Sequence, residues 1–187
     1  TCADLQYDLA RSYDASIVAT GSGVGTTYFG AGGYNLIDPS DPSYDLESSY
    51  TGPLTGAADA QAHFDKAASC EGKTITYHFA KAWADFPYSA ASLFTTDPYE
   101  KSFDKGPANQ WAINSDGPYV LQGDSYDTQV GATFVRNKEY DASTDSTKVR
   151  GAYPDTVKFE MVDSPETITE RLIADSANDQ TAFTPAN

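Results

Sequence analysis

The order of strand and helix patterns in the second half of the chain constrains its fold most. The stretch NSDGPYVLQGDSYDTQVGATFVRNKEYDAS, residues 114–143, predicts two strands around a polar turn. Pro118 has no backbone N–H, so we expect it at the start of the strand at 119–122 and not in its middle. This order predicts a mixed α/β class, in the α+β sense. The patterns that follow the hairpin are a strand at 157–162, a helix at 165–174 and a short strand at 181–183.

The first half of the chain begins with a helix pattern. TCADLQYDLARSYD, residues 1–14, combines a capping box of Thr1 and Asp4 with an apolar residue at every fourth position. Residues 63–81 predict a β-hairpin, because a Glu-Gly turn precedes a run in which apolar and polar residues alternate. Residues 85–94 then predict a short helix. Helices and strands are therefore expected in both halves.

Two segments of unusual composition separate these patterns. TGSGVGTTYFGAGG, residues 20–33, contains neither the G-x-G-x-x-G fingerprint nor the G-K-[ST] of a phosphate loop, so a flexible loop is the better interpretation. DPSDPSYDLESSYTGPLTG, residues 38–56, is rich in acidic residues, as a calcium-binding loop would be. It lacks the EF-hand pattern, however, and a solvated surface loop is expected.

Charge and cysteine content exclude several classes of protein. The formal net charge is −15, from 27 acidic and 12 basic residues, which disfavours a nucleic-acid partner. No apolar run approaches the roughly 18 residues of a membrane helix. Cys2 and Cys70 are the only cysteines, and His63 and His78 lie at no metal-ligand spacing from them. A disulfide between the two cysteines, which would place the protein outside the cytosol, and two buried free thiols are the alternatives, and the disulfide is favoured.

The sequence offers little that predicts catalysis. There are two histidines and no G-x-S-x-G elbow, and a carboxylate pair cannot be singled out among so many acidic residues. His78 alternates with apolar neighbours, as an outward-facing strand residue does. We therefore predict that the protein is not an enzyme, with no catalytic residues, no metal site and no cofactor.

Several segments, in order, resemble the family 5 extracellular solute-binding proteins of ABC transporters. Thr1–Arg11 is similar to the family's T-A-D-D-V-x-Y-x-x-x-R helix. NSDGPYVL, 114–121, resembles its N-G-T-G-P-Y-x-L strand, with Ser-Asp in place of the usual pair. RNKEY, 136–140, and PDTVKF, 154–159, resemble its R-N-x-x-Y and P-x-x-V-x-F elements. The match covers most of the chain and is closest to the actinobacterial members of the dipeptide and oligopeptide-binding group.

The resemblance implies a two-lobed fold of the periplasmic-binding-protein type II, with ligand enclosed between the lobes. Residues 57–187 would form part of the first lobe. The first helix together with the Gly-rich and Pro/Ser-rich segments, residues 1–56, would contribute an auxiliary subdomain. The chain would then be part of a longer protein. In oligopeptide binders of this group, aromatic residues after the first helix face the cleft.

The function implied is capture of a peptide, or of a related small solute such as a nickel complex or an oligosaccharide, for delivery to a membrane permease. The parent protein would be extracellular, at the cell surface, and anchored by a lipid. The expected ligand-contacting residues are Tyr28, Phe29 and Tyr34, although these rings would instead pack a subdomain core if they do not reach the cleft. A cell-surface adhesion or structural module is the competing hypothesis. Such a module should be a closed domain, whereas part of a lobe should leave an open sheet edge or an exposed apolar face.

Overall fold

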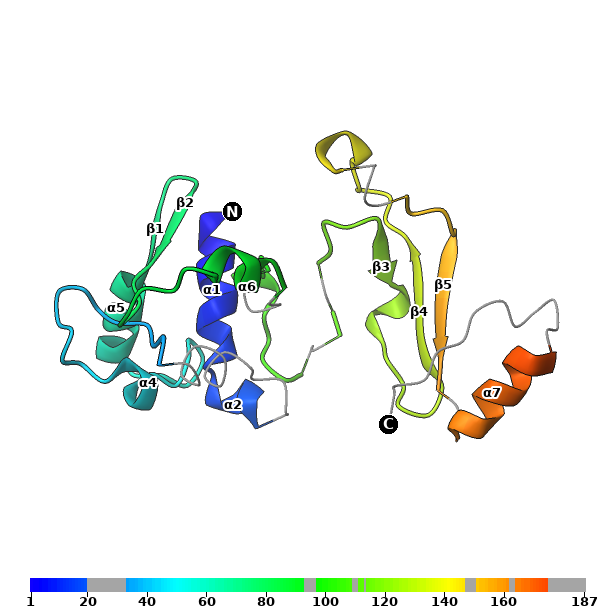
Figure 1. Cartoon of the computed structure of the whole chain (residues 1–187), viewed down its shortest axis with the longest axis horizontal. Coiled ribbons are helices and arrows are strands. Elements are labelled where there is room, and N and C mark those ends of the chain that lie inside the picture. Colours follow the sequence, from blue (N-terminus) through cyan, green and yellow to red (C-terminus); the bar gives the residue numbers. More distant parts are fainter. Residues whose placement is uncertain are drawn as a thin grey trace. The chain divides into compact units, whose positions relative to one another are not determined.

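The chain contains helices and antiparallel strands in two compact units, Thr1–Gln110 and Trp111–Asn187, each described by itself (Figure 1). The predicted mixed α/β class is confirmed. The structure is a computed structural model, and it describes residues 1–19, 33–92, 97–108, 111–112, 114–146, 151–161 and 164–174. No helix among these residues is long and apolar enough to span a membrane.

The described residues of the first unit form mainly helices, which surround a β-hairpin. The predicted first helix and its capping box are confirmed, and the predicted hairpin forms, but residues 63–67 belong to the helix before it. Ile17 and Val18 lie in the short helix α2 that follows the first helix. The elements are α1 (Cys2–Ser12), α2 (Ala15–Val18), α4 (Leu46–Ser49), α5 (Ala58–Ala67), β1 (Ala68–Glu71), β2 (Thr74–Tyr77), α6 (Phe86–Ser92) and the 3-10 helix η2 (Lys101–Phe103).

Three aromatic rings lie at the centre of this unit. Leu9 and Tyr13, from the predicted apolar stripe of α1, are buried against Phe64 of α5 and Tyr50. The rings of Tyr50 and Phe64 stack with centroids 4.5 Å apart, and Tyr13 meets Phe64 at 6.0 Å. Residues on both sides of the predicted boundary at residue 56 thus share one core. The compact units part instead between Gln110 and Trp111, and the assignment of residues 57–187 to one lobe stays a prediction.

The predicted disulfide is present. Cys2 in the first turn of α1 and Cys70 in β1 are joined, with an S–S distance of 2.05 Å. The β1–β2 turn that follows contains Gly72 with a φ of 59°, a backbone conformation that glycine adopts without steric cost. The disulfide connects the first helix to the hairpin across 68 positions of sequence.

The expectation of a solvated loop at residues 38–56 is wrong. Leu46 and Tyr50 are buried, and so is the carboxylate of Asp14, which accepts hydrogen bonds from the backbone N–H groups of Leu54 (2.7 Å) and Thr55 (3.1 Å). A Cβ atom at Gly52 would lie 2.2 Å from the Cα of Asp14, so glycine is required for this close approach. The polar composition is explained by turns that hold the segment against the core.

The described residues of the second unit form a three-stranded antiparallel sheet and one following helix. Strand β4 lies between β3 and β5 (Figure 1), and Phe134 of β4 faces Leu121 of β3 and Val157 of β5. As predicted, Pro118 precedes β3, and its carbonyl accepts from the N–H of Asn137 at 2.9 Å. The predicted strand at 181–183 lies outside the described residues. The elements are β3 (Tyr119–Leu121), the 3-10 helix η3 (Gln122–Asp124), β4 (Gly131–Arg136), the 3-10 helix η4 (Ala142–Thr144), β5 (Thr156–Glu160) and α7 (Pro165–Ala174).

The second unit leaves several large apolar side chains open to solvent, on β5, directly after it and on α7. Strand β5 pairs with β4 alone among the described strands. Phe159 is 46% exposed and Met161, directly after β5, is 47% exposed. On α7, Ile173 is more exposed still. The described residues of this unit therefore form an open layer and not a closed domain.

Candidate functional site

Tyr34 is the one predicted ligand-contacting residue that lies within the described residues, since Tyr28 and Phe29 fall outside them. It precedes a short extended segment that pairs with the chain leaving β2. Leu36 forms an antiparallel bridge with Phe79, and the N–H of Ala80 donates to the carbonyl of Asn35 at 2.9 Å. This pairing brings Tyr34 beside residues that lie some fifty positions later in the sequence.

Tyr34 is part of a group of rings that we call the aromatic platform. Its ring stacks on Trp83 with centroids 4.5 Å apart and an interplanar angle of 18°. The ammonium group of Lys81 lies 4.5 Å from the centroid of Tyr34. Trp83 continues to Phe86 at 5.3 Å. The platform consists of Tyr34, Tyr77, Phe79, Trp83 and Phe86, all partly exposed.

The platform combines flat apolar faces with a positive charge. Such faces stack on planar or apolar groups of a ligand. The Lys81 ammonium can pair with a carboxylate. Tyr34 is half-buried, so it supports the platform as well as lining it. His78, expected to face outward, is only partly exposed, and its backbone carbonyl accepts from Ile37 at 2.9 Å.

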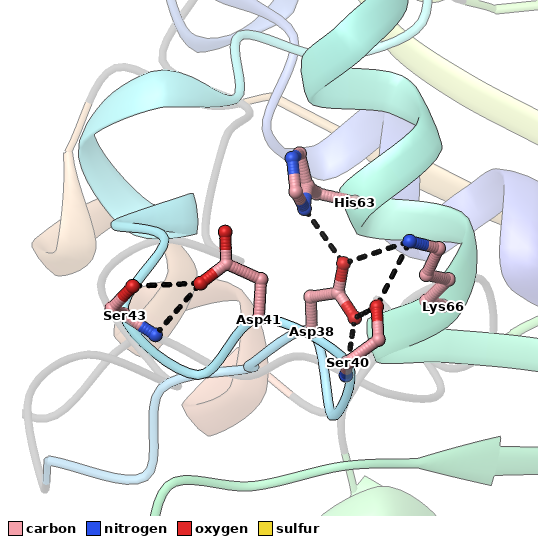
Figure 2. Close-up of polar contacts among 6 residues, drawn as sticks. All are labelled: Asp38, Ser40, Asp41, Ser43, His63 and Lys66. Atoms are coloured by element: carbon pink, nitrogen blue, oxygen red, sulfur yellow. Dashed lines mark hydrogen bonds and ion pairs between the residues drawn. The ribbon is translucent and has the colours of Figure 1, made fainter.

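A second site, which the sequence did not predict, surrounds Asp38 (Figure 2). One carboxylate oxygen accepts from the backbone N–H of Ser40 at 2.7 Å and from its hydroxyl at 2.6 Å. The other oxygen lies 2.6 Å from Nδ1 of His63 and 3.3 Å from Nζ of Lys66, both on α5. The Asp38 side chain is fully buried, whereas that of His63 is 22% exposed.

Hydrogen bonds keep the Asp38 carboxylate ionised. Burial opposes its charge, but donors from Ser40, His63 and Lys66 outweigh that effect and hold the pKa of Asp38 well below its ordinary value. Because an ionised carboxylate only accepts, Nδ1 of His63 carries the proton of this contact. The other ring nitrogen, Nε2, then has the lone pair whenever the imidazole is neutral.

Packing fixes the orientation of the His63 ring. Tyr44 stacks on it with centroids 3.7 Å apart and an interplanar angle of 13°. The sequence did contain a signal for the turn at Asp38, in the repeated Asp-Pro-Ser triplet. Asp41 accepts hydrogen bonds from Ser43 just as Asp38 accepts them from Ser40. His63 gave no such signal, since it lies 25 positions from Asp38 and meets it only through folding.

A third group of polar side chains lies between α1 and the segment around residue 104. The buried carboxylate of Asp104 accepts from Arg11 at 2.8 Å and from the hydroxyl of Tyr7 at 3.0 Å. Nearby, burial raises the pKa of Asp8 to about 7, with Arg11 opposing and the charges of Asp97 and Asp104 reinforcing the shift. These residues hold the segment around residue 104 against α1.

The second unit contains an open cavity of about 310 Å³ along β4 and β5, lined in part by Asp127, Thr133 and Lys158. It includes none of the predicted ligand residues. Among the described residues, no group of three or more His, Cys, Asp or Glu side chains is placed to hold a metal ion. The aromatic platform is therefore the candidate site that contains a predicted residue.

Comparison with known proteins adds no relative. No protein-family model, no curated protein and no solved structure matches this chain. The resemblance to solute-binding proteins thus depends on the sequence motifs described above.

Proposed function

We propose that this chain is part of an extracellular solute-binding protein of an ABC importer, and that it captures peptides for a membrane permease. The order of four sequence elements that resemble the family is the starting point. The observation that carries the proposal is the stacking of Tyr34 on Trp83, beside Lys81. This arrangement supports a ligand-contacting role for Tyr34.

The chemistry of the platform fits a short peptide. Flat aromatic rings bury apolar surface of many kinds of side chain, at roughly 25 cal/mol per Å², so two or three of them give affinity with little dependence on side-chain identity. Lys81 provides a partner for the terminal carboxylate of a peptide. An importer that accepts many peptides needs this combination of tolerance and one fixed charge contact.

One further feature supports this proposal over a cell-surface adhesion module, whereas the disulfide does not distinguish the two. The Cys2–Cys70 bond suits a protein that works outside the cytosol, although it suits both hypotheses. An adhesion module should also be closed. The described part of the second unit leaves β5 with one neighbour and Phe159 half exposed, which favours part of a larger lobe.

Trp83 makes a direct binding test possible, because the chain has only two tryptophans, Trp83 and Trp111. In a Trp111→Phe background, Trp83 fluorescence is titrated with di- to pentapeptides that lack aromatic residues. A chain that supplies one side of a cleft should bind weakly, with dissociation constants of about 1 mM or more. Tyr34→Ala should abolish the response. Tyr153→Ala, which removes an exposed ring from the second unit, is the matched control.

A second arm tests the charge contact. Lys81→Ala should weaken binding of peptides with a free carboxylate and leave peptides with a terminal amide unchanged. If no peptide perturbs Trp83 at tens of millimolar, or if Tyr34→Ala and Tyr153→Ala behave alike, the platform is not a peptide site. Micromolar binding would show instead that the cleft is complete within this chain, and the interpretation as part of one lobe would be wrong.

A further inference from the structure

Solute binding gives no role to the Asp38–His63 pair. We propose that His63 is a nucleophile toward activated acyl donors, such as aryl esters and thioesters, and that Asp38 positions it. The inference does not depend on the proposed transport function. It concerns a site separate from the aromatic platform, on residues for which the sequence predicted no chemistry.

Three observations carry the proposal. The contact of 2.6 Å between Asp38 and Nδ1 fixes the proton on that nitrogen. Nε2 makes no hydrogen bond within the described part of the chain, and Figure 2 shows it directed away from Asp38. The side chain of His63 keeps 22% of its surface accessible while Tyr44 covers one face of the ring. A rigid imidazole thus presents its lone pair toward solvent.

The arrangement corresponds to the base and its orienting carboxylate in a Ser-His-Asp triad, without the serine. Without a serine, the imidazole itself is the nucleophile and attacks the acyl carbon. Nε2 forms a bond to the acyl carbon, the bond from that carbon to the leaving oxygen or sulfur breaks, and the leaving group departs with the electron pair. The acyl-imidazolium that results is positively charged and lies against the buried Asp38 carboxylate, which stabilises it.

Water then completes the cycle. It attacks the acyl carbon, the bond to Nε2 breaks, and the acid is released while one proton passes to solvent or to the leaving group. His63 returns neutral with its proton on Nδ1. The net reaction is ester plus water giving acid plus alcohol, or thiol for a thioester, and no further reactant is needed.

His78 provides a matched control, because it is the only other histidine and no described carboxylate contacts its ring. Hydrolysis of p-nitrophenyl acetate is followed at about pH 8, where an ordinary imidazole is neutral. We expect His63→Gln to remove at least about nine-tenths of the histidine-dependent rate and His78→Gln to leave it unchanged. The wild-type rate should exceed that of equimolar free imidazole about tenfold. Many turnovers should occur, since acyl-imidazole hydrolyses and acyl-lysine does not.

The positioning role of Asp38 needs a readout other than rate. The ¹⁵N shifts of neutral His63 should report a proton on Nδ1 in the wild type and a mixture of tautomers in Asp38→Asn, with a rate loss of at least about tenfold. If Asp38→Asn does not fold, the proposal is tested by the ¹⁵N spectrum of the wild type and by the hydrolysis rates of the two histidine variants. The proposal is overturned if His63→Gln keeps the wild-type rate, if only lysines become acetylated, or if neutral wild-type His63 carries its proton on Nε2.

Discussion

The two units differ in how completely they bury their apolar side chains. In the first unit, Leu9, Leu36 and Phe64 are almost inaccessible to solvent. In the second unit, Leu121 is the one buried apolar side chain among the described residues, while Phe159 and Ile173 are open. Aliphatic and aromatic residues occur throughout both units, so a lack of apolar residues does not explain the contrast.

The number of layers explains it. In the first unit, helices α1 and α5 pack on the β1–β2 hairpin and enclose a core between them. In the described part of the second unit, η3 contacts β4 and α7 reaches β5 through an ion pair between Arg171 and Glu160 at 3.7 Å, and neither forms a second layer over the sheet. A single layer cannot bury an apolar face, because burial requires a second layer against it. The first unit therefore has the interactions that give stability, and both candidate sites lie in it.

The largest effect that separates the units should come from the disulfide. Closing a loop of 68 positions restricts the unfolded chain and should stabilise the first unit by about 4 kcal/mol. Replacing Cys2 and Cys70 with alanine should remove most of this stabilisation of the first unit. Trp83 reports the first unit and Trp111 the second, so urea unfolding followed in single-tryptophan variants separates them.

The expected result is a large shift in the transition seen by Trp83 and little change in that seen by Trp111. Equal shifts of both transitions would mean that the two units unfold as one, and the comparison would fail. Treatment of the wild type with reductant is the control, and it should reproduce the shift of the double variant.

A matched pair of leucine variants tests the difference in burial directly. Leu9 in α1 is fully buried and Leu172 in α7 is 45% exposed. Leu9→Ala should lower the free energy of unfolding of its unit by about 3 kcal/mol, from lost transfer energy and the cavity left behind. Leu172→Ala should cost less than about 1 kcal/mol. A cost at Leu172 close to that at Leu9 would show that α7 is covered in solution.

Local patterns in the sequence predicted elements well where short-range physics decides. The bounds of α7 follow from its proline and apolar stripe, and the start of β3 follows from the missing N–H of Pro118. The disulfide followed from the isolation of two cysteines. Residues 38–56 were mispredicted because their prolines, serines and carboxylates are typical of exposed loops. Nothing local indicates that Asp14 anchors this segment from a distance of about forty positions.

The candidate sites were predictable to a smaller extent for the same reason. Tyr34 was identified through a resemblance, but Trp83 and Lys81 reach it through a pairing of distant segments. The clustering of Phe79, Trp83 and Phe86 at intervals of three and four positions was a signal that could have been used. His63 and Asp38 had no pattern in common, so only the folded chain relates them.

The smallest expected difference between the units is in how their stability depends on pH. Asp8, on α1, has its pKa raised by burial to about 7, whereas a carboxyl in the unfolded chain titrates near 3.8. The folded state therefore binds the proton more tightly. The stability that this carboxyl contributes is present below about pH 4 and is lost as pH rises through about 7.

Asp8→Asn should remove that loss, because the amide stays neutral at every pH. The full shift would correspond to about 4 kcal/mol, but the carboxyl is partly exposed and solvent screening reduces this to about 1–2 kcal/mol. We expect the variant to be more stable than the wild type at pH 8 and equal to it near pH 4, as seen by Trp83 in urea unfolding. Asp116→Asn, at an exposed position of the second unit, should show no such divergence. A stability difference at Asp8 that stays constant from about pH 4 to pH 8 would mean that its carboxyl is solvated in the folded chain, and that the first unit does not bury charge there.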